Sequence, residues 1–148
     1  PYGSHIAVVE VDQDTGEITL SRYFGTDDFG VVINPLLAEG QVHGGLAQGI
    51  GQALYEGAQY DDAGVPVLDP PIPRFDQVPV FETAFIETPT PTNPLGAKGI
   101  GEAGAIAAPP AVVNAVIDAL WHLGVREMDM PLTPERVLAA IDATGAHP

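Results

Sequence analysis

The stretch NPLLAEGQVHGGLAQGIGQALYE, residues 34–56, decides how this chain folds, because it carries the periodicity of a core helix. Asn34 is suited to cap a helix, and Pro35 is suited to its first position. Apolar side chains then recur every four residues: Val42, Leu46, Ile50 and Leu54. The pattern predicts a helix from Asn34 to about Glu56 that buries this face, with Gly57 as its stop.

The same stretch contains glycines that an isolated helix would avoid: Gly40, Gly44, Gly45, Gly49 and Gly51. Each interior glycine costs up to ~1 kcal/mol relative to alanine. A second face of the helix combines glycine with amides: Gln41, Gly45, Gln48 and Gln52. Two explanations stay open for this face. Either the helix backbone packs closely against another element, or a polar ligand approaches the glycines and the glutamine amides.

The segments before and after this helix favour β-strands. Residues 5–12 and 17–24 are rich in β-formers and are joined by the turn sequence QDTG, which predicts a β-hairpin. Residues 58–61 suggest a short strand, and residues 80–87, VFETAFIE, suggest a longer one. A proline-rich connection, residues 88–96, follows the last strand.

Two further helices are expected near the end of the chain. Pro109 and Pro110 precede an apolar helical stripe that Gly124 ends, and Thr133 with Pro134 begins a last short helix. The elements do not alternate regularly between strand and helix. We therefore expect one α+β domain over residues 1–148, in which a β-hairpin and further strands pack against three helices.

The composition bounds the function. The 148 residues are 45% hydrophobic and 17% charged, which is typical of a folded domain, and the net charge is −15. Such a charge disfavours nucleic-acid binding. The chain has no cysteine, which excludes disulfides, thiolate metal sites and cysteine-ligated iron–sulfur clusters within it. No apolar run approaches the length of a membrane span and no signal peptide is visible, so we expect no membrane contact and a cytoplasmic location.

The stretch GAKGIGEAG, residues 96–104, contains the single lysine of the chain, Lys98. It matches the GxGxxG pattern at residues 99–104, but a dinucleotide site needs a strand that runs directly into the first glycine. Here the proline-rich connection intervenes, so a nucleotide-binding protein is the weakest of the alternatives.

Glu102 in this stretch has two explanations. It could be a solvated carboxylate at the entry of a helix, where negative charge is favourable. It could instead be a general base, because glycines and small apolar residues around it would solvate the carboxylate poorly and tend to raise its pKa. Lys98 could pair with an anion or balance Glu102. The four histidines are scattered, so we expect no metal held by side chains of this chain.

Four stretches together resemble one enzyme family. They are HIAVVEVDQDTGEI (5–18), INPLLAEGQVHGGLAQGIGQALYEG (33–57), NPLGAKGIGEAGAIAAPPAVVNAVIDAL (93–120) and MPLTPERV (130–137). In this order they resemble the C-terminal part of the molybdopterin-binding large subunit of the xanthine dehydrogenase, aldehyde oxidase and aerobic carbon monoxide dehydrogenase family. The resemblance covers nearly the whole chain and implies a molybdopterin-binding domain of the second type.

The resemblance implies roles for specific residues. The matching glutamate of that family is the catalytic base of a hydroxylation at molybdenum, which here is Glu102. The loop of Lys98, Gly99, Ile100 and Gly101 would lie beside the cofactor, and Gln41 with Gly44 and Gly45 would contact it. The cofactor would be molybdopterin with molybdenum, shared with segments outside this chain, and its form, with or without a cytosine dinucleotide, is left open.

The resemblance also implies partners. They are the remainder of the molybdopterin-binding subunit, iron–sulfur and flavin subunits, and a small substrate such as an aldehyde, a heterocycle or carbon monoxide. The chain would be a fragment or a small split subunit. It departs from the family in its DDFG turn, residues 27–30, and in a shorter stretch over residues 68–79. The alternative is a catalytically silent domain that serves a structural or partner-binding purpose and holds no cofactor alone.

Overall fold

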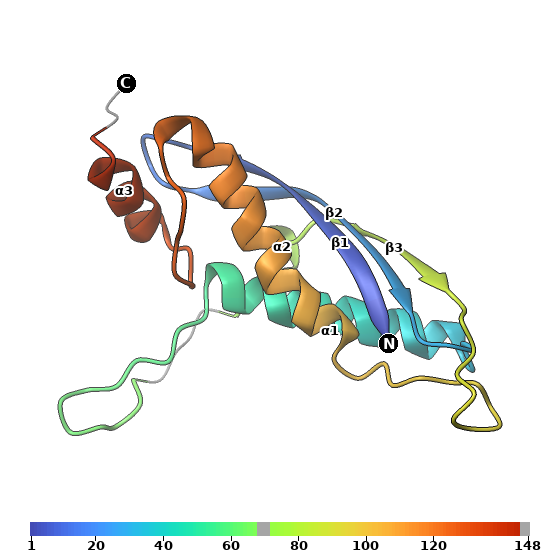
Figure 1. Cartoon of the computed structure of the whole chain (residues 1–148). Coiled ribbons are helices and arrows are strands. Elements are labelled where there is room, and N and C mark those ends of the chain that lie inside the picture. The colour runs from blue at the N-terminus through green and yellow to red at the C-terminus, as the bar shows by residue number, and fades with distance from the viewer. Residues whose placement is uncertain (68–71, 146–148) are drawn as a thin grey trace.

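The computed structural model describes residues 1–67 and 72–145 and contains one three-stranded sheet covered by helices (Figure 1). Strands β1 (Tyr2–Val11) and β2 (Ile18–Asp28) form an antiparallel hairpin, and β3 (Phe81–Ile86) pairs in parallel with β2. Helices α1 (Pro35–Leu54) and α2 (Ala103–Leu120) cross each other beneath the strands, as Figure 1 shows. The predicted α+β class is confirmed.

The remaining elements are short. Single 3-10 turns occur at Phe75–Gln77 and at Trp121–Leu123, and helix α3 spans Pro134–Ala143. Gly124 follows α2 and the second turn with a φ of 93°, so it ends this helical region as predicted. In Figure 1 α3 lies at the far end of the molecule from the loop that joins β3 to α2.

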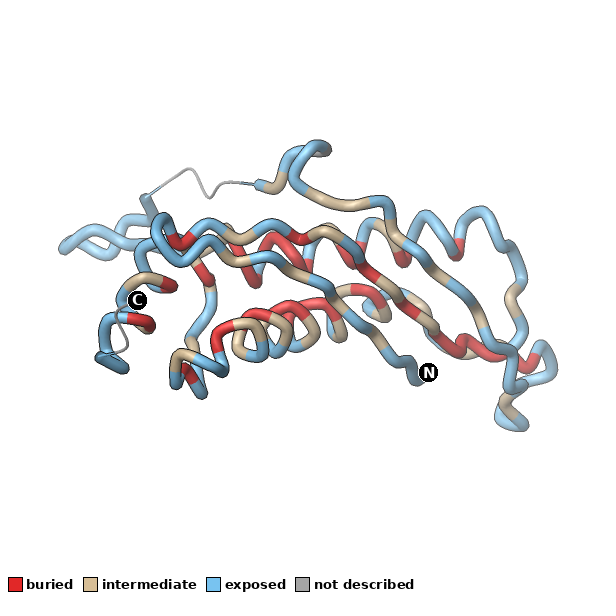
Figure 2. Tube along the Cα trace, turned by 90° about the horizontal axis from the view of Figure 1, so that it is seen from above, coloured by how far each residue is buried: buried red, intermediate tan, exposed pale blue. Residues whose placement is uncertain are grey.

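The core lies between the sheet and the two long helices. Figure 2 shows the buried residues where the strands and helices face one another. The predicted apolar face of α1 is confirmed, because its members are all buried: Val42, Leu46, Ile50 and Leu54. From α2 the core receives Ala108, Val112, Val116 and Leu120, and from the strands Leu20 and Tyr23.

Two sequence-based predictions were wrong, one of a strand and one of the start of a helix. Residues 58–61 form no strand; Tyr60 makes only an isolated bridge to Pro66, in an arm that extends from the body of the protein (Figure 1). Helix α2 begins at Ala103, not after the prolines, so Pro109 and Pro110 lie inside it. Prolines remove helical hydrogen bonds, but here packing against α1 holds the first turns in place.

Glycines allow α1 and α2 to approach closely. A Cβ atom on Gly104 would lie 2.4 Å from the carbonyl oxygen of Val42, and one on Gly49 would lie 2.9 Å from Cδ of Pro109. A Cβ on Gly45 would lie 3.0 Å from the amide nitrogen of Ala105. The packing explanation for the glycines of α1 therefore holds for Gly45 and Gly49.

Helix α2 also corrects the expectation that no apolar run reaches the length of a membrane span. Together with the next turn, Ala103–Leu123 has 21 residues and a mean hydropathy of 1.5, which is long and apolar enough by length and composition. The core helix of a folded protein passes the same test. Because α2 buries one face against α1 and β1, its apolar character is explained by the core.

The helix crossing can be tested with two alanine variants. We expect Gly104→Ala to lower the free energy of unfolding by about 1–3 kcal/mol, because the new methyl group would meet backbone atoms of α1. The matched control is Gly40→Ala, at an exposed position of α1 with open space around it. This change should leave stability unaltered or raise it by up to ~1 kcal/mol. Equal effects in urea denaturation would contradict the described crossing.

Candidate functional site

The loop that carries Glu102 is fastened to the end of β2. The amide of Lys98 donates to the carbonyl of Phe29 at 2.6 Å, and the amide of Val31 donates to the carbonyl of Gly96 at 3.1 Å. A Cβ on Gly30 would lie 2.1 Å from that Gly96 oxygen, and both glycines have positive φ angles, 67° and 66°. Only glycine fits this contact, so the backbone places the loop beside β2.

An ion pair strengthens this attachment. Nζ of Lys98 lies 2.8 Å from Oδ1 of Asp28, and the amide of Gly30 donates to the same oxygen at 2.8 Å. The Asp28 side chain is fully buried, and that of Lys98 is 17% exposed. The single lysine is therefore paired with Asp28, the last residue of β2, and not with Glu102.

The environment of Asp28 favours its ionised form. Burial alone raises the pKa of this carboxyl, but the hydrogen bonds from Lys98, Thr88 and Gly30 outweigh burial and hold the pKa well below its ordinary value of 3.8. The carboxylate thus keeps its negative charge inside the protein, and the ammonium of Lys98 is the cation that balances it.

A second attachment joins the other side of the loop to α1. Nε2 of Gln41 donates to the carbonyl of Gly101 at 2.6 Å. Glu102 follows at the position before the first residue of α2, and its side chain makes no capping hydrogen bond. Because Gly104 lies against α1, the start of α2 is fixed as well. Gln41, which was predicted to lie at the same site although it is 60 residues away in the sequence, therefore contacts the loop.

The loop separates two hollows. One has a volume of about 660 Å³ and is lined by Glu102, Gly99, Gly101, Asp27, Ile106 and the first residues of β1. The other has a volume of about 450 Å³ and is lined by Gln41, Lys98, Ile100 and residues that precede and begin α1. The predicted residues of the loop and Gln41 are thus brought together around open space.

The environment of Glu102 differs from the sequence-based expectation. The residue is exposed and lines the larger hollow, so the prediction of a poorly solvated carboxylate is wrong for this chain. The cause is the lack of bulk around it, since Cβ atoms on Gly99 and Gly101 would meet nothing within 4 Å. The carboxylate is therefore free to meet a ligand.

Backbone donors in the loop are also free. In the described part of the chain, the amides of Gly99, Ile100 and Gly101 donate to no acceptor. Consecutive unpaired N–H groups beside a hollow form a site where a polar or anionic group can bind. The loop therefore offers hydrogen-bond donors and one carboxylate on the same few residues.

Two predicted residues of α1 have other surroundings. Gly45 is buried against α2 and lines neither hollow, so it acts on helix packing. Gly44 is exposed with open space beside it. Gln48 and Gln52 line a different hollow, beside the arm that contains Tyr60. The glycine and amide face of the sequence is therefore divided among three environments.

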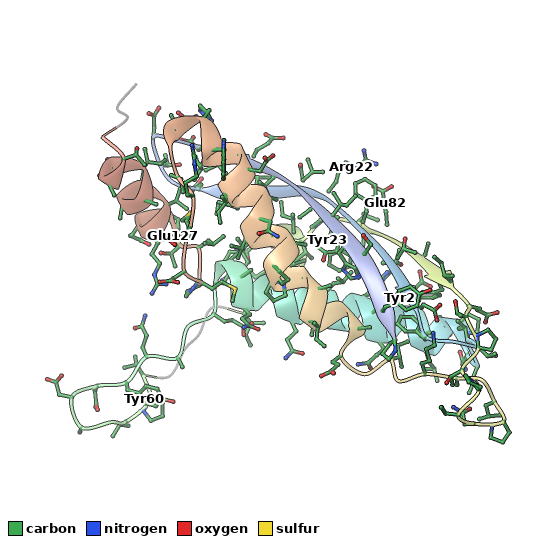
Figure 3. All side chains as sticks on the ribbon, in the orientation of Figure 1. Tyr2, Arg22, Tyr23, Tyr60, Glu82 and Glu127 are labelled. Atoms are coloured by element: carbon green, nitrogen blue, oxygen red, sulfur yellow. The ribbon has the colours of Figure 1, made fainter. Side chains whose placement is uncertain are left out.

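A hydrogen-bonded chain that reaches the hollow of Glu102 through Asp27 was not predicted from the sequence. Nδ1 of His5 lies 2.9 Å from the hydroxyl of Tyr23, and its Nε2 lies 3.1 Å from Oδ1 of Asp27. The ring of His5 covers Gly25, its partner across the hairpin. Burial, and then the charge of Asp27, raise the pKa of Tyr23. Figure 3 shows Tyr23 within the protein, between the strands and the helices.

Asp27 and Asp28 are buried charged residues for which the sequence-based interpretation offered no partners. The DDFG turn was noted only as a departure from a family pattern. The signal was available, because two adjacent acids at the end of an apolar strand are costly unless each finds a partner. Neighbouring residues of a strand point to opposite sides, so Asp27 pairs with His5 and Asp28 with Lys98.

The structure also bears on the remaining alternatives. The segment between β3 and Gly99 contains no strand, so the arrangement that a dinucleotide site requires is absent from these described residues. No group of three or more His, Cys, Asp or Glu side chains suited to a metal ion occurs within residues 1–67 and 72–145. The first four residues of the predicted shortened stretch, 68–71, lie outside the described residues.

Comparison with known proteins identifies the class. Residues 1–79, more than half of the chain, match the molybdopterin cofactor-binding domain. The chain belongs to this family of domains. The family expected from the sequence is therefore confirmed.

Individual relatives extend the similarity over nearly the whole chain. The nicotine 6-hydroxylase large subunit of Paenarthrobacter nicotinovorans is 44% identical over 142 residues, 93% of this chain and 17% of the relative. The carbon monoxide dehydrogenase large chain of Hydrogenophaga pseudoflava is 40% identical over 93% of this chain and 18% of the relative. The crystal structure of quinoline 2-oxidoreductase from Pseudomonas putida 86 superimposes with a TM-score of 0.90 at 45% identity, covering 95% of this chain and 18% of that one. The chain thus spans under a fifth of the length of these relatives.

The pairing of Asp28 predicts how stability depends on pH. A carboxyl whose pKa is lowered by folding stabilises the protein above its unfolded value of 3.8, and this contribution is lost as the pH falls below that value. The difference in unfolding free energy between wild type and Asp28→Asn should therefore be largest near neutral pH and shrink below pH 3.8. Asp62→Asn, which removes an exposed carboxylate from the arm, shows the effect of losing one charge. A difference that stays constant down to strongly acidic pH would contradict the assignment.

Proposed function

We propose that this chain is the molybdopterin-binding domain of a molybdenum hydroxylase and that Glu102 is its general base. The observation that carries the proposal is the placement of Glu102 beside unpaired loop amides at an open hollow, in a chain of the molybdopterin cofactor-binding family. The relatives named as a hydroxylase, a dehydrogenase and an oxidoreductase support the same reaction class.

The residues present fit the cofactor. Molybdopterin is polar and anionic, and the amides of Gly99, Ile100 and Gly101 offer free donors toward it. Gln41 borders the same loop through its bond to Gly101, and Gly44 leaves the adjacent surface of α1 open. Gly45 would support the site indirectly, by holding α1 against α2. When bound, the cofactor supplies the molybdenum centre that oxidises the substrate.

The chemistry of Glu102 follows from its position. Its carboxylate is exposed to the hollow and makes no capping hydrogen bond, so its oxygens are available to accept a proton. It stands at the position before the first residue of α2, on the wall of the hollow. A base in this place could take a proton from a group bound in the hollow and return to its charged state when the proton leaves.

The substrate and partners are inferred from the relatives. We infer a small substrate of the aldehyde, heterocycle or carbon monoxide type, since relatives are named for nicotine, quinoline and carbon monoxide. Names such as large subunit and large chain support the remainder of the molybdopterin-binding subunit as the first partner. The proposal includes iron–sulfur and flavin subunits, a cytoplasmic location, and molybdopterin with or without a cytosine dinucleotide.

An exposed apolar surface supports the need for a partner. Around the start of α1, Ile33, Leu36 and Leu37 are 67%, 78% and 69% exposed, and Leu95 of the proline-rich connection is 65% exposed. Apolar surface of this kind is typical of docking sites. The same observation favours the second candidate function, a silent domain that docks onto the remainder of the subunit without acting on the substrate.

Replacing Glu102 separates the two candidates. In the assembled, molybdenum-containing enzyme, Glu102→Gln should lower kcat by about 100- to 10,000-fold, because the amide cannot accept the proton. Molybdenum content should be unchanged. Glu127→Gln is the matched control, since Glu127 is exposed and Figure 3 places it at the opposite end of the protein from Tyr2, which lines the hollow. Wild-type kcat in Glu102→Gln would exclude the base and favour the silent domain.

A further inference from the structure

We propose that Asp28 is a positioning residue for the reaction, and that Lys98 holds the Glu102 loop on Asp28 instead of contacting the cofactor. The proposal rests on the function proposed above for the loop. It gives a role to Asp28, to which sequence reasoning gave none. It also changes the expected role of Lys98 from binding the cofactor to fixing the backbone that binds it.

The ion pair joins two segments of the chain at one buried oxygen. Oδ1 of Asp28 accepts from both Nζ of Lys98 and the amide of Gly30, each at 2.8 Å. These two donors come from the loop and from the turn after β2, so one buried oxygen joins the two segments. A buried carboxylate that loses its cation is strongly destabilised. The protein therefore has a physical reason to keep Lys98 on Asp28.

The loop is held at both ends. At one end, the side chain of Lys98 is paired with Asp28 and its amide with Phe29. At the other end, Gln41 binds the carbonyl of Gly101. The three free amides lie between these points and Glu102 follows directly. Moving the Lys98 anchor would therefore move the donors and the base together.

Little of the Lys98 side chain is accessible to a ligand. Its side chain is 17% exposed, and Nζ also lies 5.1 Å from the ring centre of Tyr2, within the range of a cation–π contact. An anionic cofactor that took this ammonium would leave Asp28 buried without its cation. The free amides of the loop can receive such a cofactor at no comparable cost.

A double-mutant cycle tests the proposal in the assembled enzyme. The variants are Asp28→Asn, Lys98→Gln and the two combined, which removes both charges and avoids leaving either alone. If Lys98 acts through Asp28, each single variant and the double variant should lower kcat by a similar factor, on the order of 10- to 100-fold, and any change in KM or molybdenum content should be equal among the three variants. Direct cofactor contact predicts instead that the two losses multiply and that Lys98→Gln loses molybdenum.

Hydrogen exchange gives a readout that does not depend on activity. Each variant should speed exchange at the amides of Lys98 and Val31, which bond across the attachment, without speeding exchange in the β1–β2 hairpin. This result would stand even if Glu102 proved not to be the base. The control is the ion pair between Arg22 and Glu82, which are labelled in Figure 3. Nη2 of Arg22 lies 2.8 Å from Oε1 of Glu82, and the two side chains are 58% and 47% exposed. Removing it should affect neither readout. Unchanged exchange at Lys98 in Asp28→Asn, or molybdenum loss in Lys98→Gln alone, would overturn the proposal.

Discussion

The buried ion pair between Lys98 and Asp28 joins two parts of the sequence that the fold must bring together, the end of the hairpin and the loop before α2. Its effect is local and geometric. A surface ion pair would add little to stability. A buried pair with a second donor from Gly30 fixes where the loop lies against the end of β2. The positions of the unpaired loop amides and of Glu102 depend on this attachment, together with the bond from Gln41 to Gly101 at the other end of the loop.

The crossing of α1 and α2 is the second constraint. Gly45, Gly49 and Gly104 remove the side chains that would keep the helices apart, and α2 then continues through Pro109 and Pro110. This crossing brings Gln41 to the carbonyl of Gly101, and so connects the glycine-rich helix with the glycine-rich loop. Glycine lowers the helix propensity of these positions, but it lets the backbones of α1 and α2 approach each other. This is why the sequence of α1 is unfavourable for an isolated helix.

The elements whose apolar side chains recur with a clear period could be predicted from the sequence. The hairpin, the buried face of α1 with Val42 and Leu46, and strand β3 all follow from spacing and turn chemistry, which are local. The start of α2 could not be read in this way, because contacts with α1 override the prolines there. The strand expected at residues 58–61 lacked a partner beyond a single bridge.

For the candidate site, the stretch GAKGIGEAG predicted which loop lines the hollows, but not which residues surround that loop. The exposure of Glu102 and the pairing of Lys98 depend on residues far away in the sequence, so spacing alone could not supply them.

If this chain forms part of a cofactor-bearing enzyme, molybdenum should accompany it through purification. The measurement to make is the molybdenum content of the protein purified from cells that make molybdopterin, determined by mass spectrometry together with the native mass. We expect stoichiometric molybdenum in a particle larger than the 148-residue chain. A monomer without molybdenum, purified under conditions in which a related enzyme acquires its metal, would contradict it.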